Sequence, residues 1–360
     1  MEPKARIIGF DLARAYAILG MFIVNFNIVF GNYTNHDGLN RFLNLFNGNS
    51  STLFVMLAGM GVALMSNRPE YSQQERKSIR SLILKRSGFL FVIGLLLFFW
   101  WPADILHFYG GYLHLAAFIL FLPRVWYLIS ALVAVGIWHV LFFFIPFETG
   151  WNFETFHYAD FWTVEGFLRN TFYNGWNPIF PWVAYFFGGM WLGRLHWQNH
   201  AVKTKVALVA AGLYLLVEAF RHAAAQPGFP TGLAQYLLAD YMPPTAPFIL
   251  STASFGCLVI VLMLWLGDKY GETRVAQALV STGQMTLTHY IFSLTLGMLL
   301  LTLFTGNSMP GNGDDEHPVA ALVILAYSIV YFIASVMFSV FWKYKFRHGP
   351  MEMLMREISG

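Results

Sequence analysis

A histidine and an aspartate stand side by side in the stretch NYTNHDGLN, as His36 and Asp37, just after the first long apolar run of the chain. An imidazole can act as a general base or a nucleophile near neutral pH, and a carboxylate can orient its ring. Neighbours in sequence rarely point at each other, so Asp37 can equally cap a turn. The residue types therefore leave open both a catalytic loop and an ordinary polar connection.

Two asparagines, Asn25 and Asn27, interrupt the preceding apolar run in the sequence IVNFN. A buried amide in hydrocarbon usually joins helices through hydrogen bonds. Its NH₂ group could also donate to an oxygen that becomes negatively charged in a transition state. Helix joining is the simpler interpretation of these residues, and stabilisation of an oxyanion is the alternative.

Further polar groups lie in or beside later apolar runs. His107 and His114 share one helix face in ILHFYGGYLHLAAF but stand about 10 Å apart along its axis, so these two alone cannot hold one metal ion. His289 lies inside TGQMTLTHYIF, and Asn177 ends an aromatic-rich segment that we expect at the outer membrane surface. Interhelical hydrogen bonding and substrate contact both remain open for these residues. No HExxH or paired CxxC motif is present, so we expect no metal site.

A strongly basic stretch, RPEYSQQERKSIRSLILKR, follows the second apolar run, and we expect it to be a cytoplasmic loop. Its Arg80, Lys85 and Arg86 could contact anionic lipids or the phosphates of a nucleotide-type cofactor. Arg14 stands three residues after Asp11, which fits either an ion pair or a place at the mouth of a cavity. No GxxxxGK[ST] motif is present, and the glycines of AGMGVA and FFGGMWLG fit close helix packing.

The elements that position these residues are those of a membrane protein. Of the 360 residues, 57% are hydrophobic and only 11% are charged, and the mean hydropathy is +0.54. A soluble domain usually carries about 25% charged residues. Membrane topology explains the small positive charge, so we expect no nucleic-acid partner. A single cysteine, Cys257, excludes an internal disulfide.

Ten apolar segments predict an all-α, polytopic bundle of about ten transmembrane helices, forming a single integral-membrane domain over residues 1–360. The segments are 12–31, 48–66, 87–101, 106–123, 125–145, 178–197, 204–222, 245–267, 281–305 and 319–342. With both termini in the cytoplasm, all of the 22 Lys and Arg residues fall on the cytoplasmic side except Arg41, Arg169 and Arg221. His36 and Asp37 then lie at the outer, non-cytoplasmic end of the first helix.

Several stretches together resemble one family over nearly the whole chain. The opening RIIGFDLARAYAILGMFIVN, with a histidine eleven residues after Asn25, is similar to the start of the transmembrane acyltransferase superfamily. NPIFPWVAYFFGGMWLGRL, STGQMTLTHYIFS and the tail KFRHGPMEMLMRE resemble its YeiB-type branch, a domain of unknown function with a characteristic Gly-Pro-x-Glu ending. That ending corresponds here to Gly349, Pro350 and Glu352. One departure is His289, where the branch usually shows asparagine.

The superfamily includes the lysosomal heparan-α-glucosaminide N-acetyltransferase. The resemblance therefore implies an enzyme that takes an acyl group from cytosolic acyl-CoA, with acetyl-CoA as the expected donor, and passes it to an acceptor on the far side. By position, His36 would be the catalytic histidine and Asn25 the assisting asparagine. On physical grounds we add Asp37 as an orienting group, Arg14, Arg80, Lys85 and Arg86 for the donor phosphates, and His289, His114 and Asn177 for the substrate.

The sequence leaves open whether the acceptor is a sugar, an amine or a lipid-linked group, how long the acyl chain is, and whether His36 itself is acylated. The branch suggests a bacterial inner membrane, and a homodimer remains open. A transporter of a small molecule or lipid precursor is the competing class, because it also lines a membrane cavity with polar groups. A non-catalytic scaffold is a third reading. Binding of acyl-CoA and sensitivity to His36→Ala distinguish the enzyme from both.

Overall fold

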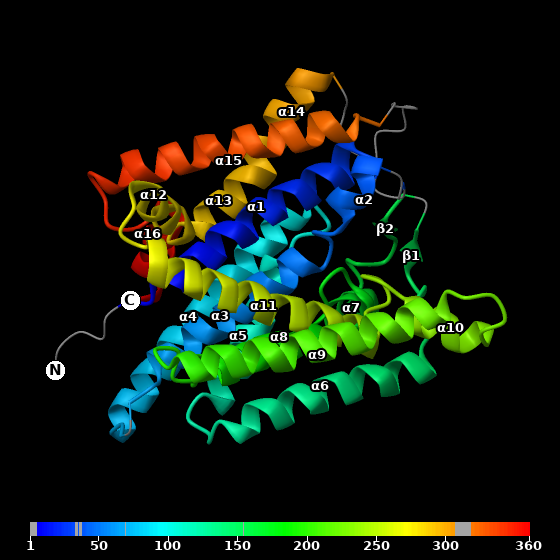
Figure 1. The fold of residues 1–360 in the computed structure, drawn as a ribbon, viewed down its shortest axis with the longest axis horizontal. Helices are drawn as coiled ribbons and strands as arrows, with labels where there is room; N and C mark the ends of the chain where they lie inside the picture. The colour runs from blue at the N-terminus through cyan, green and yellow to red at the C-terminus, as the bar shows by residue number, and fades with distance from the viewer. Residues whose placement is uncertain (1–5, 33–34, 36–37, 69, 154, 307–317) are drawn as a thin grey trace. The chain divides into compact units, whose positions relative to one another are not determined.

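The computed structural model describes residues 6–32, 35, 38–68, 70–153, 155–306 and 318–360. Most of these residues are helical (Figure 1), and the strands within these ranges are β1 (Trp151–Asn152) and β2 (His157–Tyr158), which pair antiparallel. The predicted all-α class is confirmed. The chain divides into two compact units, Met1–Phe54 with Phe255–Leu354, and Val55–Ser254 with Met355–Gly360.

The first unit holds both the beginning and a late part of the chain. Its elements are α1 (Ile8–Phe30), α2 (Gly38–Asn44), α12 (Arg274–Gly283), α13 (Thr286–Phe292), the π-helix η2 (Ser293–Gly297), α14 (Met298–Thr305) and α15 (Ala321–Lys343). Three helices begin in one unit and end in the other: α3 (Asn49–Met65), α11 (Ala246–Tyr270) and α16 (Pro350–Ser359).

The second unit holds the middle of the chain. Its elements are α4 (Gln73–Phe98), α5 (Leu106–Ile119), α6 (Val125–Phe144), β1, β2, α7 (Val164–Arg169), the π-helix η1 (Asn170–Asn174), α8 (Ile179–Gly193), α9 (His200–Ala224) and α10 (Thr231–Leu238). Helices α4 and α5 form the predicted hairpin around Pro102, and α6 packs against α8. The two breaks expected at Pro102 and Pro123 both separate distinct helices.

Helices α1 and α15 run antiparallel within the first unit. Phe22 packs edge-to-face against Tyr331, and Phe26 packs in the same way against Tyr327, so residue numbers rise along one helix as they fall along the other. The start of α1 and the end of α15 therefore lie at the same end of this unit. An even number of membrane crossings produces this arrangement.

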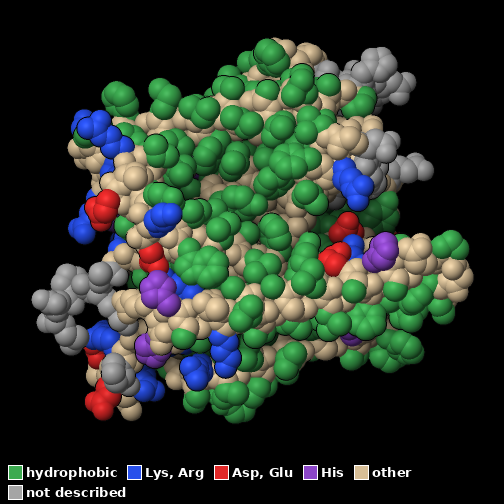
Figure 2. All heavy atoms as spheres, viewed as in Figure 1, with side chains coloured by type: hydrophobic (Ala, Val, Ile, Leu, Met, Phe, Trp, Pro, Cys, Tyr) green, Lys and Arg blue, Asp and Glu red, His purple; other side chains and the backbone are tan. Residues whose placement is uncertain are grey.

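Eight helical stretches in the described ranges are long and apolar enough to cross a membrane: Ile8–Phe30, Gly38–Met65, Gln73–Phe98, Val125–Phe144, His200–Ala224, Ala246–Tyr270, Thr286–Thr305 and Ala321–Lys343. The remaining two predicted segments correspond to the shorter helices α5 and α8. Figure 2 shows many hydrophobic side chains on the visible face of the molecule. On α15, Leu322, Val330 and Phe341 are exposed. An apolar outer face is what a helix in contact with lipid presents.

From Gln73 on, the basic stretch after the second apolar run is helical, so the loop predicted there is wrong. Helix α4 begins at Gln73, because the Ser72 side chain accepts from Glu75 N while the Glu75 carboxylate accepts from Ser72 N. This reciprocal capping satisfies two backbone donors at the helix start. The sequence from Tyr71 to Ser87 contains no glycine or proline that would end the helix early.

Glycines bring α3 and α8 into close contact within the second unit. A Cβ atom at Gly59 would lie 2.0 Å from Phe186 O, and one at Gly189 would lie 2.1 Å from Met56 O. Each helix thus presents a glycine to the backbone of the other, which is the small-residue packing typical of membrane helices. The interpretation of AGMGVA and FFGGMWLG as packing motifs is confirmed.

Candidate functional site

Asn25 and Asn27 occupy the second half of α1 and are both buried, but their side chains differ in their partners. Asn27 Nδ2 donates to Asn44 Oδ1 at 3.3 Å, and Asn44 Nδ2 donates in turn to Asn35 O at 3.0 Å. Asn27 therefore joins α1 to α2. Asn25 Nδ2 is buried and has no hydrogen-bond partner among the described residues.

An unsatisfied amide at membrane depth is costly, because hydrocarbon offers no replacement for water. Asn25 lies five residues before the end of α1 at Phe30, about 7.5 Å along the helix. Its amide is thus a donor held close to the loop that follows α1. His36 and Asp37 belong to that loop and lie outside the described residues.

A glycine stands at each end of this loop, where α1 ends and where α2 begins. A Cβ atom at Gly31 would lie 2.1 Å from Asn27 Oδ1, so the chain leaves α1 through a position that only glycine fits without rearrangement. At the other end, Gly38 starts α2 with a positive φ of 51°. Glycines thus stand at the end of α1 and at the start of α2, on either side of the segment that carries His36.

Buried hydroxyls at the start of α3 extend the polar region of the first unit, and sequence reasoning missed them. Ser50 Oγ and Thr52 Oγ1 are buried with no partner in the described ranges. Ser50 faces α1, because a Cβ atom at Gly20 would lie 2.0 Å from Ser50 Oγ. The signal in the sequence was the polar run NGNSST that opens an apolar helix.

Asp11 forms an ion-pair cluster at the start of α1. Its buried carboxylate accepts from Arg6 Nε at 2.6 Å and from Arg14 Nη1 at 2.8 Å. Gln284 Nε2 lies 3.4 Å from the same carboxylate. The ion pair expected between Asp11 and Arg14 is present, and it uses one nitrogen of the guanidinium group.

His289 is buried in α13 and is satisfied by a neighbouring helix. Its Nε2 atom lies 2.6 Å from Ser339 Oγ, and that hydroxyl donates to Ser335 O at 2.8 Å. Because the hydroxyl proton is already used, the imidazole donates from Nε2. The structure thus gives His289 an interhelical hydrogen bond, which is the simpler of the two interpretations.

His114 and Asn177 both belong to the second unit but have different surroundings. His114 is exposed on α5 and lines an apolar pocket of about 530 Å³ with residues of α4 and η1. Asn177 is buried, and its side-chain Nδ2 donates to the Tyr241 hydroxyl at 2.7 Å. The backbone carbonyl oxygen of Asn177 accepts from the Tyr112 hydroxyl at 2.5 Å. Asn177 therefore holds segments together, whereas His114 is open to contact.

A buried carboxylate–imidazole pair lies at the start of α5, and its aspartate was not predicted as a partner. Asp104 Oδ2 accepts from Leu106 N at 2.8 Å and His107 N at 3.2 Å, and it lies 3.4 Å from His107 Nδ1. Both side chains are fully buried. Asp104 thus caps α5, and the contact of His107 is local, not interhelical; its Nε2 atom is buried and has no hydrogen-bond partner among the described residues.

Of the four cations predicted to bind donor phosphates, the three on α4 have different surroundings. Arg80 Nε donates to Ala117 O of α5 at 3.1 Å, and Arg86 Nη1 lies 3.9 Å from Met65 Sδ. Lys85 instead lines an open polar pocket together with Lys77. The structure does not gather Arg80, Lys85 and Arg86 around one group. No three His, Cys, Asp or Glu side chains gather as a metal site in the part of the chain that the structure describes.

Residues 6–222 match the family model described as heparan-α-glucosaminide N-acetyltransferase, catalytic. The chain belongs to this membrane acyltransferase family. Residues 191–359 also match the model described as a protein of unknown function, DUF418, so the acyltransferase-related DUF418 branch expected from the sequence is confirmed. No curated protein matches the chain significantly. The acyltransferase match includes α1, its two asparagines and the loop that follows.

Proposed function

We propose that this protein transfers an acyl group from cytosolic acyl-CoA to an acceptor on the other side of the membrane. The observation that carries the proposal is the buried Asn25 amide, which has no partner among the described residues and lies close to the loop that holds His36. The family match supports acyl transfer as the reaction. Acetyl-CoA is the donor to test first, because the family description names an N-acetyltransferase.

In the proposed reaction, an N–H or O–H group of the acceptor attacks the carbonyl carbon of the thioester. His36 takes the acceptor proton as the new bond forms, and Asp37 orients the imidazole ring. The carbonyl oxygen becomes an oxyanion, and Asn25 Nδ2 donates a hydrogen bond to it. When the C–S bond breaks, the carbonyl forms again and CoA leaves as a thiolate that takes up the proton. Transfer through an acylated His36 would use the same groups in two steps.

The remaining assignments stay predictions. Arg14, Arg80, Lys85 and Arg86 are the proposed contacts of the donor phosphates, and His289, His114 and Asn177 are the proposed contacts of the substrate. Of these, Lys85 and His114 are the two whose side chains line open pockets. A single membrane domain over residues 1–360, a bacterial inner membrane and a homodimer are likewise proposals.

The experiment uses the full chain in detergent. Its thermal stability is measured with acetyl-CoA, longer acyl-CoAs and free CoA, and release of the CoA thiol is followed with amine, sugar and lipid-linked acceptors. A ligand at 100 times its dissociation constant should stabilise the folded state by about 2.7 kcal/mol. His36→Ala should keep this stabilisation and lose thiol release. His222→Ala, at an exposed histidine of α9, is the control and should keep both.

Two results would contradict the proposal. Stabilisation by none of the acyl-CoAs would favour the transporter. The second is a His36→Ala variant that acyl-CoA still stabilises and that still releases the thiol at the wild-type rate. The protein would then bind acyl-CoA, but His36 would take no part in the reaction.

A further inference from the structure

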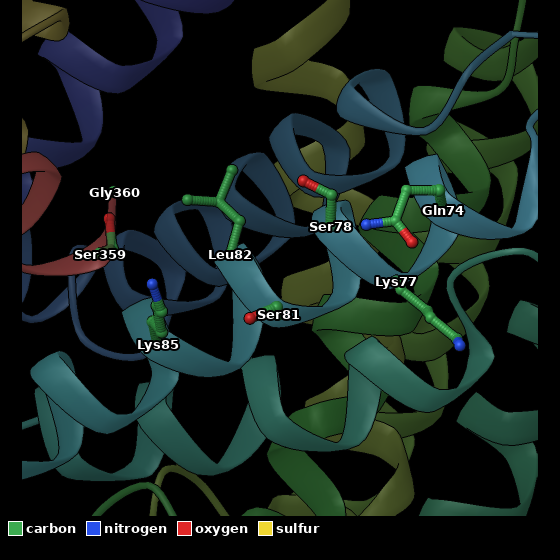
Figure 3. Close-up of a pocket in the computed structure, with 8 residues that line it drawn as sticks. All are labelled: Gln74, Lys77, Ser78, Ser81, Leu82, Lys85, Ser359 and Gly360. Carbon is green, nitrogen blue, oxygen red and sulfur yellow. The ribbon is translucent and has the colours of Figure 1, made fainter.

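A polar pocket of about 400 Å³ lies along the first half of α4, within the second unit (Figure 3). Its lining from α4 comprises Gln74, Lys77, Ser78, Ser81, Leu82 and Lys85, and the end of the chain adds Ser359 and Gly360. Each α4 residue of the lining lies three or four positions from another one, so together they form one stripe along the helix. In Figure 3 the Lys85 nitrogen points toward Ser359 and Gly360.

The two lysines of this pocket have no protein partner within the described ranges. Neither Lys77 nor Lys85 forms an ion pair or a hydrogen bond there, although other cations of the second unit do. Glu75, the acidic residue of α4, is engaged by Arg68 at 3.0 Å and by Ser72 N. The pocket therefore presents two ammonium groups with no side-chain carboxylate in its lining, although Gly360 at the end of the given sequence lies beside Lys85. This excess of positive side chains favours an anionic ligand.

A second observation also indicates a polar ligand. Ser359 is 2% exposed, lines the pocket, and has a hydroxyl with no hydrogen-bond partner among the described residues. Ser78 and Ser81 add two exposed hydroxyls on the opposite wall. The lining thus combines two positive charges with three hydroxyl groups.

The position of the pocket along α4 sets the depth at which a ligand would bind. Helix α4 has 26 residues, so it is about 39 Å long and exceeds the hydrocarbon thickness of about 30 Å. Its last charged residue is Arg86, and the helix is apolar from Phe89 to Phe98 apart from Gly94. Lys85 therefore lies just before the apolar part of the helix, and Lys77 lies about 12 Å further from it. This is the depth of phospholipid headgroups.

The lining favours one phosphate on a hydroxylated headgroup over a nucleotide. None of the eight lining residues is aromatic, so the pocket has no ring on which a nucleotide base could stack. None is an arginine, which could donate two parallel hydrogen bonds to a phosphate. Lysines act as point charges that suit a single phosphate, and the serine and glutamine side chains can exchange hydrogen bonds with headgroup hydroxyls.

We propose that this pocket binds the headgroup of an anionic glycerophospholipid, with its phosphate between Lys77 and Lys85 and its hydroxyls toward Ser78, Ser81 and Ser359. This proposal assigns Lys85 to a lipid phosphate in place of the donor phosphate suggested above, and it uses none of the groups proposed for acyl transfer, Asn25, His36 and Asp37. Its test therefore does not depend on turnover.

The test measures dissociation constants of the full detergent-purified chain for short-chain phosphatidylglycerol below its micelle concentration. Phosphatidylcholine with the same chains, glycerol phosphate and coenzyme A are the comparison ligands. We expect phosphatidylglycerol to bind at least about tenfold more tightly than phosphatidylcholine, and the double variant Lys77→Gln, Lys85→Gln to lose that difference. Lys205→Gln, at an exposed lysine of α9, should leave it unchanged.

Three outcomes would overturn the proposal. Equal binding of the two lipids would exclude recognition of an anionic headgroup. Glycerol phosphate binding as tightly as the lipid would make this a site for soluble phosphate. Displacement of the lipid by coenzyme A, abolished in the double variant, would assign the lysines to the donor instead.

Discussion

The Thr288 hydroxyl donates a hydrogen bond of 2.5 Å to the Glu352 carboxylate, and it joins α13 to the start of α16. The other carboxylate oxygen accepts from Leu287 N at 2.8 Å and from Thr288 N at 3.2 Å. Met351 N completes the contact by donating to Thr288 Oγ1 at 3.0 Å. Glu352 thus satisfies backbone donors at the start of α13, where the helix dipole also favours a carboxylate. This contact gives the Gly-Pro-x-Glu ending a structural role.

Removing the Glu352 carboxylate should destabilise the fold. Glu352→Ala leaves two backbone donors and one hydroxyl unsatisfied, and we expect the free energy of unfolding to fall by about 2–3 kcal/mol. Glu352→Gln keeps one acceptor oxygen and should cost about 1 kcal/mol. Thermal unfolding of the purified chain measures both, with exposed Glu357→Gln as the control. Equal melting temperatures for wild type and Glu352→Ala would show that the tail is not anchored by this residue.

The same carboxyl should make stability depend on pH. Burial raises the pKa of Glu352 above its ordinary value of 4.5, although its hydrogen bonds from Thr288 and Leu287 act in the opposite direction. The folded chain then holds this proton more tightly than the unfolded chain does. The resulting stabilisation is complete below pH 4.5 and is lost as the pH rises through the folded-state pKa. The melting temperature of wild type minus that of Glu352→Gln should therefore increase as the pH falls from neutral toward 4.5; a constant difference would refute this.

Much of the fold could be predicted because hydrophobic length is a local property. All ten apolar segments correspond to helices, and the break at Pro102 is where proline chemistry places it. The loop predicted before Ser87 was wrong because that prediction rested on the many charged residues of the stretch. A helix outside the hydrocarbon can carry just as many charged residues as a loop. Its capping box, Ser72 with Glu75, was the local signal that it starts a helix.

The site could be predicted only in part, because its decisive contacts are not local. Asn25 and Asn27 look alike in IVNFN, and only the position of Asn44 shows which of them is already paired. His289 finds its acceptor at Ser339, fifty residues away, on another helix. No spacing rule in a single sequence reports such partners.

The contact between α3 and α8 should tolerate no side chain at Gly189. Gly189→Ala would place a methyl group against the Met56 carbonyl, and we expect a loss of about 1–3 kcal/mol of stability from overpacking. The neighbouring Gly188 provides a matched control, because a Cβ atom there would meet nothing within 4 Å. Gly188→Ala should be neutral or stabilising by up to about 1 kcal/mol, since alanine favours helix. Similar melting temperatures for the two variants would contradict the close packing.

Substitutions of the two asparagines of α1 should affect different properties: catalysis for Asn25 and stability for Asn27. Asn25→Leu keeps the side-chain volume but removes the proposed oxyanion donor, so kcat for CoA release should fall by about 10²–10³ with little change in KM. Stability should be unchanged or higher, because Asn25 Nδ2 has no partner among the described residues to lose.

Asn27→Leu is the matched control. It breaks the 3.3 Å hydrogen bond to Asn44, so it should cost about 1 kcal/mol of stability and keep kcat within a few-fold of the wild-type value. The two measurements are steady-state release of the CoA thiol and thermal unfolding of the same preparations. Full turnover in Asn25→Leu would remove this amide from the mechanism, and a large loss of stability in that variant would make Asn25 a helix-joining residue like Asn27.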